Sequence, residues 1–156
     1  MKNFKKYSSF IVVILFSIVL GLFLSNANEP EKNISTNNVK YVKIAGAIVK
    51  VDLALDIKDQ GKGLSGRNSL LSDEGMLFIF SKPDKNYFWM KEMNFPIDMV
   101  WIGDDFKVIY IKNNAQPSSY PESFGPDVDS RYVLEISAGF SEKNNLKVGD
   151  FVEFLD

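Results

Sequence analysis

Two carboxylates occur inside strand-like stretches of this sequence, where they could do acid–base chemistry. In residues 97–102 alternate side chains share a face, so Asp98 lies with Val100 on an apolar face. The same alternation in a later strand places Glu135 with Val133. A carboxylate in such a place either finds a partner or changes its pKa, because an isolated buried charge is costly.

Arg67 and Lys91 are the cations that we expect to partner these acids. In one interpretation Asp98 and Glu135 divide the proton-donor and proton-acceptor roles of a hydrolase, and Arg67 or Lys91 holds an anionic group of the ligand. In the other interpretation the four side chains form a buried ion-pair network that fixes the strand register. The network is the favoured interpretation, since the sequence supplies no activated nucleophile.

The sequence contains neither cysteine nor histidine. This absence excludes the usual zinc sites, nucleophiles activated by histidine, and disulfides. We therefore expect no cofactor and no metal site of these kinds. A third interpretation, a copper(I)-handling protein, rests on the thioethers of Met76, Met90, Met93 and Met99 near Trp89. Methionine more often fills a core, and no histidine or cysteine completes such a site.

The aromatic residues around position 89 could line a binding groove. Alternation in residues 87–91 places Phe88 and Met90 on one face, and Trp89 and Lys91 on the other. We expect Phe88 and Met90 in the core. Trp89 is left open, because it could pack in the hairpin or stack on a sugar ring or peptide group.

The N-terminus has the pattern of an export segment. Lys2, Lys5 and Lys6 precede an apolar run over residues 10–24, which is typical of a signal peptide ending near residue 27. The alternative is an uncleaved membrane anchor over residues 7–24. Both interpretations place the remaining chain outside the cytoplasm, secreted or held at the outer face of the cytoplasmic membrane.

The segment that follows, residues 28–38, is polar and is expected to be a tether. The full chain has 18 basic and 20 acidic residues, and removal of residues 1–27 leaves 15 and 20, a net charge of −5. A net-negative domain without a basic cluster argues against nucleic acid as a partner.

Residues 39–156 are expected to form one β-rich domain. The class is mainly β with some helix (α+β): a curled antiparallel sheet or partly open barrel with two short helices, preceded by the hydrophobic N-terminal helix. Strands are expected over residues 39–44, 47–55, 76–80, 87–91, 97–102, 106–111, 131–137 and 151–155. Helices are expected over 57–64, with Asp56 as N-cap, and 138–145; a turn at 82–84 and a long strandless loop over 113–130 complete the domain.

Several short motifs carry a family resemblance. They are Gly-Met-Leu-Phe, Phe-Trp-Met-Lys and Pro-Ile-Asp within residues 75–102, Gly-Leu-Ser-Gly-Arg at 63–67, and Val-Leu-Glu at 133–135. With these motifs the chain resembles the family named domain of unknown function 192. The resemblance implies a β-rich fold in a cell-surface setting, and it places Arg67, Lys91, Asp98 and Glu135 on motif positions. The chain departs from the pattern at Ser65, where Met is common, and at residues 91–94, which replace a more usual Lys-Asn-Thr.

From these observations we expect a binding or accessory module of the cell envelope. Its rim would consist of Arg67, Trp89 and the loop over residues 113–130, and its partner would be an envelope glycan or protein, with the membrane as a further partner if the anchor stays uncleaved. The alternatives are the hydrolase that uses Asp98 and Glu135 and, third, the copper(I)-handling protein.

Overall fold

The computed structural model describes residues 38–156. The predicted signal peptide or anchor, and all but the last residue of the predicted tether, lie outside the described residues. Within residues 38–156 no helix is both long enough and apolar enough to cross a membrane.

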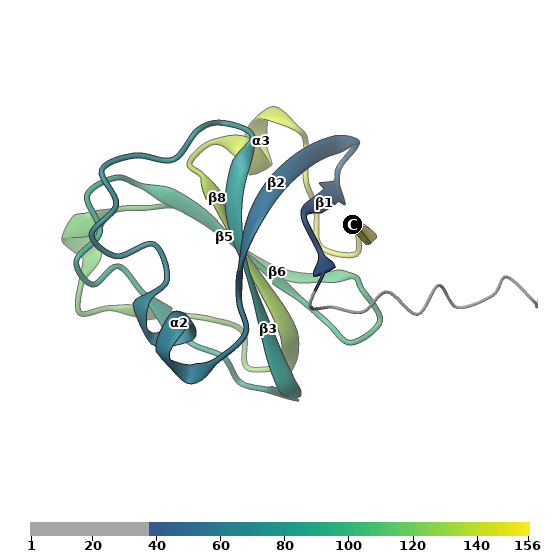
Figure 1. Cartoon of the computed structure of the whole chain (residues 1–156), viewed down its shortest axis with the longest axis horizontal. Helices are drawn as coiled ribbons and strands as arrows, with labels where there is room; N and C mark the ends of the chain where they lie inside the picture. Colours follow the sequence, from purple (N-terminus) through teal and green to yellow (C-terminus); the bar gives the residue numbers. More distant parts are fainter. Residues whose placement is uncertain (1–37) are drawn as a thin grey trace, which may run out of the picture. The chain divides into compact units, whose positions relative to one another are not determined.

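The described residues form a curled seven-stranded sheet with a separate two-stranded sheet beside it (Figure 1). The strand order in the large sheet is β6-β5-β8-β3-β2-β1-β9, and the small sheet pairs β4 with β7. The strands are β1 (Tyr41–Ile44), β2 (Ala47–Ala54), β3 (Glu74–Asp84), β4 (Phe88–Trp89), β5 (Ile97–Ile102), β6 (Val108–Ala115), β7 (Ser123–Phe124), β8 (Ser130–Ser137) and β9 (Val152–Leu155). The helices are α2 (Ile57–Lys62), the 3-10 helix η2 (Pro117–Ser119) and α3 (Phe140–Lys143).

The mainly β prediction with two short α-helices is confirmed, but the sheet is not wholly antiparallel. β2 and β3 pair in parallel, whereas the other neighbours pair in the antiparallel direction. A parallel pair needs a crossover, and α2 with the following loop supplies it. Asp56 begins α2 as predicted, because its side chain accepts a hydrogen bond of 2.8 Å from the Asp59 N–H.

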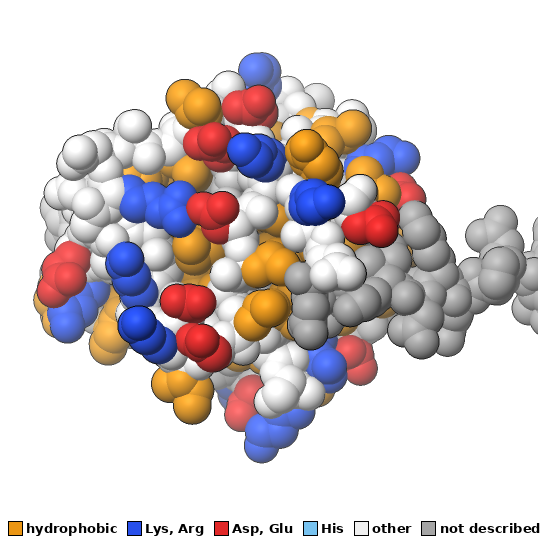
Figure 2. Space-filling view, viewed as in Figure 1, with side chains coloured by type: hydrophobic (Ala, Val, Ile, Leu, Met, Phe, Trp, Pro, Cys, Tyr) orange, Lys and Arg blue, Asp and Glu red, His pale blue; other side chains and the backbone are white. Residues whose placement is uncertain are grey.

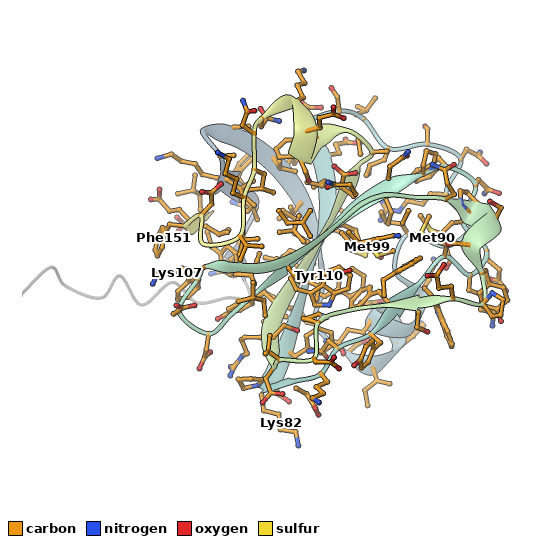
Figure 3. All side chains as sticks on the ribbon, turned by 180° about the vertical axis from the view of Figure 1, so that it is seen from behind. Lys82, Met90, Met99, Lys107, Tyr110 and Phe151 are labelled. Atoms are coloured by element: carbon orange, nitrogen blue, oxygen red, sulfur yellow. The ribbon has the colours of Figure 1, made fainter. Side chains whose placement is uncertain are left out.

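The two edges of the large sheet meet at one end. Lys107 forms an antiparallel bridge with Phe151, and both lie side by side at the same end of the molecule in Figure 3. The Val108 N–H donates to the Asp150 carbonyl at 2.9 Å, and the Val152 N–H donates to the Phe106 carbonyl at 2.8 Å. The sheet is therefore a partly closed barrel, since these bonds join β6 to β9 only near one end.

The sheet has an apolar core on each face. One core lies between the strands and α3; it includes Val100, Leu134 and Phe154. The second core lies on the other face, under the loop after α2 and the small sheet. It contains Met90 and Met99, whose side chains Figure 3 shows inside the fold. This second core borders the candidate site.

Two local predictions were wrong. The turn predicted at residues 82–84 is the end of β3, which runs on to Asp84 with a register shift after Ile79. Such an irregularity admits Pro83, which has no N–H to donate to a ladder. The long loop contains β7, in which Phe124 is buried opposite Phe88, because apolar residues of this loop cover the second core.

Candidate functional site

The two carboxylates predicted to act together point to opposite faces of the sheet. In the register of β5 and β8, Asp98 stands opposite Ile136, and Met99 stands opposite Glu135. Directly opposed residues share a face, so Asp98 faces the first core and Glu135 faces the second. The predicted cluster that joins Asp98 to Glu135 is therefore wrong, and an acid–base pair of these two residues has no geometric basis.

Asp98 is fully buried, and its carboxylate accepts hydrogen bonds from three backbone N–H groups. One carboxylate oxygen accepts from Asn114 at 2.8 Å and from Gly139 at 3.2 Å; the other accepts from Ser141 at 2.8 Å. These donors belong to the end of β6 and the beginning of α3, so Asp98 ties both to β5. The partners are backbone amides rather than the cations that we predicted, because the sheet edge and helix start leave N–H groups unpaired.

Glu135 is also buried, with 4 % of its surface exposed, but its carboxyl group is poorly satisfied. On β8 it stands between Met76 of β3 and Met99 of β5, the residues paired with it on either side. Its Oε2 atom has no hydrogen-bond partner. Burial raises the pKa of Glu135 from its ordinary value of 4.5 to about 8, although the Arg67 charge and a backbone hydrogen bond from Leu64 lower it in part. Glu135 is thus a neutral acid at pH 7.

A pocket of about 350 Å³ lies over Glu135. α2 and the loop after it form one side, and β3 and the segment that leads into β4 form the other. Five of its fifteen lining residues are aromatic. Its aromatic and polar lining residues are Phe78, Phe80, Tyr87, Phe88, Trp89, Gln60, Lys62, Ser65, Asn86 and Glu135. A volume of this size falls within the range of small-molecule sites.

Trp89 is at the rim of this pocket, which answers the question that the sequence left open. Its side chain is 53 % exposed and meets Tyr120 edge to face, with ring centroids 6.0 Å apart. Met90 is buried, so its core prediction is confirmed. Phe88 packs against the core, with its ring centroid 4.7 Å from that of Phe78, but it is only partly buried and also lines the pocket. The long loop reaches Trp89 through Tyr120, but none of its residues lines the pocket.

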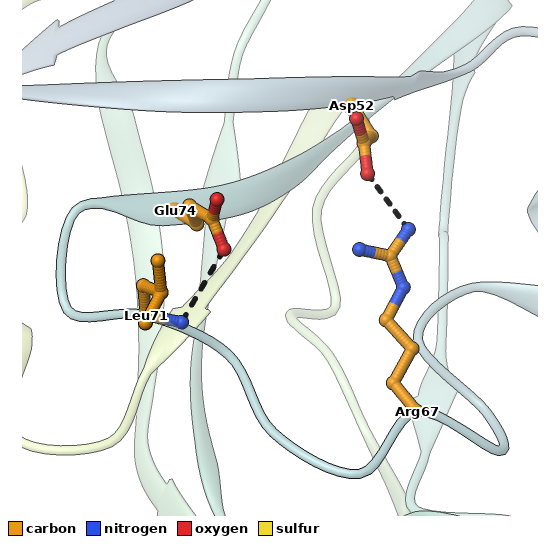
Figure 4. Close-up of polar contacts among 4 residues, drawn as sticks. All are labelled: Asp52, Arg67, Leu71 and Glu74. Atoms are coloured by element: carbon orange, nitrogen blue, oxygen red, sulfur yellow. Dashed lines mark hydrogen bonds and ion pairs between the residues drawn. The ribbon is translucent and has the colours of Figure 1, made fainter.

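Arg67 lies next to the pocket but not in it. Its guanidinium donates to the Asp52 carboxylate at 2.8 Å, an exposed pair that Figure 4 shows between the loop and β2. It lines a neighbouring groove of about 470 Å³, which shares Lys62, Gly63 and Ser65 with the pocket. Arg67 therefore acts on Glu135 only through its electrostatic field.

Lys91 is exposed and does not line the pocket, so its predicted pairing with an acid of the site is wrong. Its backbone carbonyl, however, accepts a hydrogen bond of 2.8 Å from the Ser65 hydroxyl. Two further bonds join the same two loops: Gly66 N–H to the Glu92 carbonyl at 2.9 Å, and the Asn94 side-chain amide to the Arg67 carbonyl at 2.8 Å. Residues 91–94 therefore hold the loop at residues 65–67 in place beside Glu135.

The four methionines of the copper(I) interpretation are all buried in the second core. Their exposed fractions do not exceed 9 %, and apolar and aromatic side chains surround them: Met76, Met90, Met93 and Met99. Within residues 38–156, no group of three acidic side chains is placed to hold a metal ion. The packing is that of core filler.

The family model DUF192, described as "Uncharacterized ACR", matches residues 40–154. The chain belongs to the DUF192 family. No match is found among curated proteins.

Two solved structures share the DUF192 fold. A protein of unknown function from Novosphingobium aromaticivorans is 33 % identical with a TM-score of 0.69, and the match covers 74 % of this chain and 84 % of that one. A proposed transcription regulator from Sinorhizobium meliloti is 30 % identical with a TM-score of 0.68, covering 73 % and 90 %.

In this DUF192 domain two motif glycines serve close approach rather than flexibility alone. A Cβ on Gly75 would meet the backbone oxygen of Glu135 at 2.6 Å, so only glycine lets β3 and β8 come together there. A Cβ on Gly63 would meet the Phe78 ring at 3.2 Å and Glu135 Oε2 at 3.6 Å. Gly63, which also has φ +51°, keeps space open beside the buried acid.

Sequence reasoning missed Gly63, Phe80 and Asn86 as residues of the site. Asn86 links its own segment to β8 and β5. Its side chain donates to the Ser130 carbonyl at 2.9 Å, and its own carbonyl accepts from the Trp101 ring N–H at 2.6 Å. The motif position of Gly63 was the one available signal for that residue.

Glu92, which departs from the family pattern, should have a measurable effect on the free energy of unfolding. Glu92 has φ +58°, a left-handed conformation that asparagine tolerates better than glutamate. We expect Glu92→Asn to raise the free energy of unfolding by about 1 kcal/mol. The neighbouring exposed Lys91, which lacks a positive φ, offers the matched control Lys91→Asn. Denaturant unfolding checks this, and equal effects of the two substitutions would contradict the conformational reason.

Proposed function

We propose that this DUF192 domain is a binding module of the cell envelope that holds a small ligand in the pocket over Glu135 and does not convert it. One observation carries the proposal: a pocket of about 350 Å³ with five aromatic rings lies over a nearly fully buried carboxyl group that has an unpartnered oxygen. Pockets of this build, mainly apolar with few polar groups, are typical of small-molecule sites.

The loss of stability caused by burying Glu135 supports a functional role for this residue. A buried polar atom without a partner costs about 1–3 kcal/mol, and Met or Leu would fit its apolar surroundings without that cost. Asp98, by contrast, satisfies three backbone N–H groups, so its burial has a structural explanation. A costly residue without such an explanation, placed in a pocket, is a candidate for ligand contact.

The absence of turnover follows from the same geometry. Hydrolysis by paired carboxylates needs both acids in one site, where they flank the scissile bond within about 10 Å of each other and are open to substrate. Asp98 faces the opposite core and is closed to solvent. Glu135 has no second acidic side chain beside it in the pocket lining, and the Ser65 hydroxyl in that lining is hydrogen-bonded to the Lys91 carbonyl rather than to a base.

The envelope setting is proposed from the N-terminal sequence. A basic head with an apolar run precedes a polar tether whose reach is roughly 20 Å as a random coil. A module on such a tether would meet an envelope glycan, an envelope protein or a small solute near the membrane.

Nucleic acid does not fit this surface as a partner. The net charge is −2 for the full chain, and Figure 2 shows basic and acidic side chains interspersed on the face in view. The description of the Sinorhizobium meliloti relative as a proposed regulator therefore gives no reason to assign DNA binding here.

A pocket-blocking substitution tests the proposal. Gly61 lines the pocket from α2, and a Cβ there meets no atom within 4 Å. We expect Gly61→Trp to fill the mouth, whereas Gly61→Ala leaves it open and raises the free energy of unfolding by about 0.5–1 kcal/mol through helix propensity.

The measurement is mass spectrometry of small molecules that stay with the purified full chain after incubation with a cell-envelope extract. The wild type and Gly61→Ala should retain the same compound, and Gly61→Trp should retain at least tenfold less. Equal retention by the two Gly61 variants would show that the pocket is not the binding site.

A further inference from the structure

We infer that the ligand is an oligosaccharide, with one sugar unit in the pocket over Glu135 and the next unit in an adjoining groove. This inference rests on the proposed function and adds the chemical class of the ligand. Three features carry it: the exposed rings at the mouth of the pocket, the mixed polar groups of its lining, and the groove that continues from it.

Amphipathic rings lie at the mouth of the pocket. Tyr87 and Trp89 line it, Tyr120 stands beside Trp89, and each of these side chains is about half exposed. The phenylalanine rings are less exposed, since Phe78 is buried and Phe88 is partly buried. Tyrosine and tryptophan suit places where one end of the ring system is apolar and the other is wet. A pyranose ring presents C–H groups on its faces and hydroxyl groups around its edge, so it matches such a mouth.

The polar side chains of the lining offer both kinds of hydrogen-bonding group. Lys62 contributes an ammonium group, which only donates. Gln60 and Asn86 donate their NH₂ groups to backbone carbonyls at 3.0 and 2.9 Å, so their side-chain oxygens remain as acceptors. The Ser65 hydroxyl also donates to a backbone carbonyl, and its oxygen can accept. The carboxyl group of Glu135 is nearly fully covered, so it contributes little to this choice.

This combination of groups separates the ligand classes. A hydroxyl group both donates and accepts, so a sugar pairs with the side-chain oxygens and can accept from the ammonium group of Lys62. A carboxylate or phosphate only accepts and would leave the side-chain oxygens without partners. An alkylammonium only donates, and it meets the like charge of Lys62. A neutral ligand rich in hydroxyl groups therefore matches the lining best.

The pocket continues into a second groove of about 510 Å³. The two cavities share four lining residues: Ile57, Gln60, Phe80 and Asn86. The second groove lies between the beginning of α2 and the end of β3, and its lining has both acidic and basic side chains. A ligand of more than one unit can therefore extend along α2 from the pocket into this groove.

An extended peptide matches the second groove less well. β2 pairs with β3 only as far as Phe78, so β2 leaves the edge of β3 uncovered beyond that residue. A peptide gains affinity at such an edge by adding a strand. This part of β3 contains Lys82 and Pro83, and Figure 3 shows Lys82 pointing away from the fold. Lysine and proline are residues that oppose strand addition at a free edge.

The experiment identifies the compound that the purified full chain retains from the cell-envelope extract. Tandem mass spectrometry of this compound should show the successive loss of at least two sugar residues. A compound that consists only of amino acids, only of lipid, or of a single sugar unit would overturn the inference.

Variants of Trp89 connect the compound to the mouth of the pocket. Trp89→Ala should retain at least tenfold less compound, whereas Trp89→Tyr, which keeps an aromatic ring, should retain within about threefold of the wild type. Phe151→Ala removes an exposed ring that lines neither cavity, and it should retain as much as the wild type. Equal retention by Trp89→Ala and the wild type would also overturn the inference.

The outcome separates this inference from the proposed function. If the wild-type chain retains a compound that Gly61→Trp loses, but this compound contains no sugar, the pocket binds a ligand and only the class is wrong. If the wild-type chain retains no compound, or Gly61→Trp retains as much as Gly61→Ala, both proposals fail.

Discussion

Asp98→Ala is expected to lower the free energy of unfolding by about 3–5 kcal/mol. The substitution leaves the backbone N–H groups of Asn114, Gly139 and Ser141 without their acceptor in a fully buried place. It also releases α3 and the end of β6 from β5. In a domain of this size such a loss lowers the midpoint of thermal unfolding by more than about 10 °C.

Thermal and denaturant unfolding of the full chain measure this effect. Asp98→Asn keeps one oxygen that can accept hydrogen bonds, so its free energy of unfolding should fall less than that of Asp98→Ala. It supplies the measurement if the alanine variant does not fold. Asp73→Ala, at an exposed aspartate, is the matched control and should change stability by less than about 0.5 kcal/mol. A loss below about 1 kcal/mol for Asp98→Ala would mean that the three hydrogen bonds do not hold the fold together.

Glu135 should make the domain less stable as the pH rises. Its pKa is about 8 in the folded chain and about 4.5 when solvated, so between these values the folded state keeps a proton that the unfolded state has lost. Stability is therefore fully present below pH 4.5, falls as the pH rises from 4.5 to 8, and is constant above. The loss attributable to this group amounts to several kcal/mol, at most about 5.

Glu135→Gln removes the titrating group and should flatten this dependence. We expect the variant to unfold at a higher denaturant concentration than the wild type at pH 8 and to lose the advantage near pH 4.5. Glu142→Gln should follow the wild-type profile at every pH, since the side chain is exposed. A wild-type profile that Glu135→Gln leaves unchanged would contradict the assignment of this pH dependence to Glu135.

Strand alternation predicted the environment of each acid but not their relation. It placed Asp98 on the same strand face as Val100 and Glu135 on the same strand face as Val133, and the structure confirms both placements. Which faces of two different strands coincide depends on the register between them, and a shift of one residue reverses it. Nothing within β5 or β8 alone fixes that register, so the acids were wrongly joined in one cluster.

The pocket was beyond sequence reasoning for a related reason. Its walls come from α2, the loop at residues 63–66, β3, β4 and β8, which the parallel pairing of β2 and β3 brings together. The strand at residues 76–80 and the core position of Met90 were local properties and were predicted correctly. The motif residues around 63–67 and 91–94 were recognised, but their backbone hydrogen bonds to one another depend on tertiary contact.

The ionisation of Glu135 is the most direct test of this account, because both the cost of the residue and its role in the pocket depend on a buried neutral acid. The measurement is a pH titration of the Glu135 side-chain carboxyl carbon by NMR in the full chain, with Glu135→Gln to assign the signal. The account predicts a midpoint near 8. A midpoint near 4.5 would show a solvated carboxylate and would remove the reason for regarding Glu135 as a residue kept for its ligand.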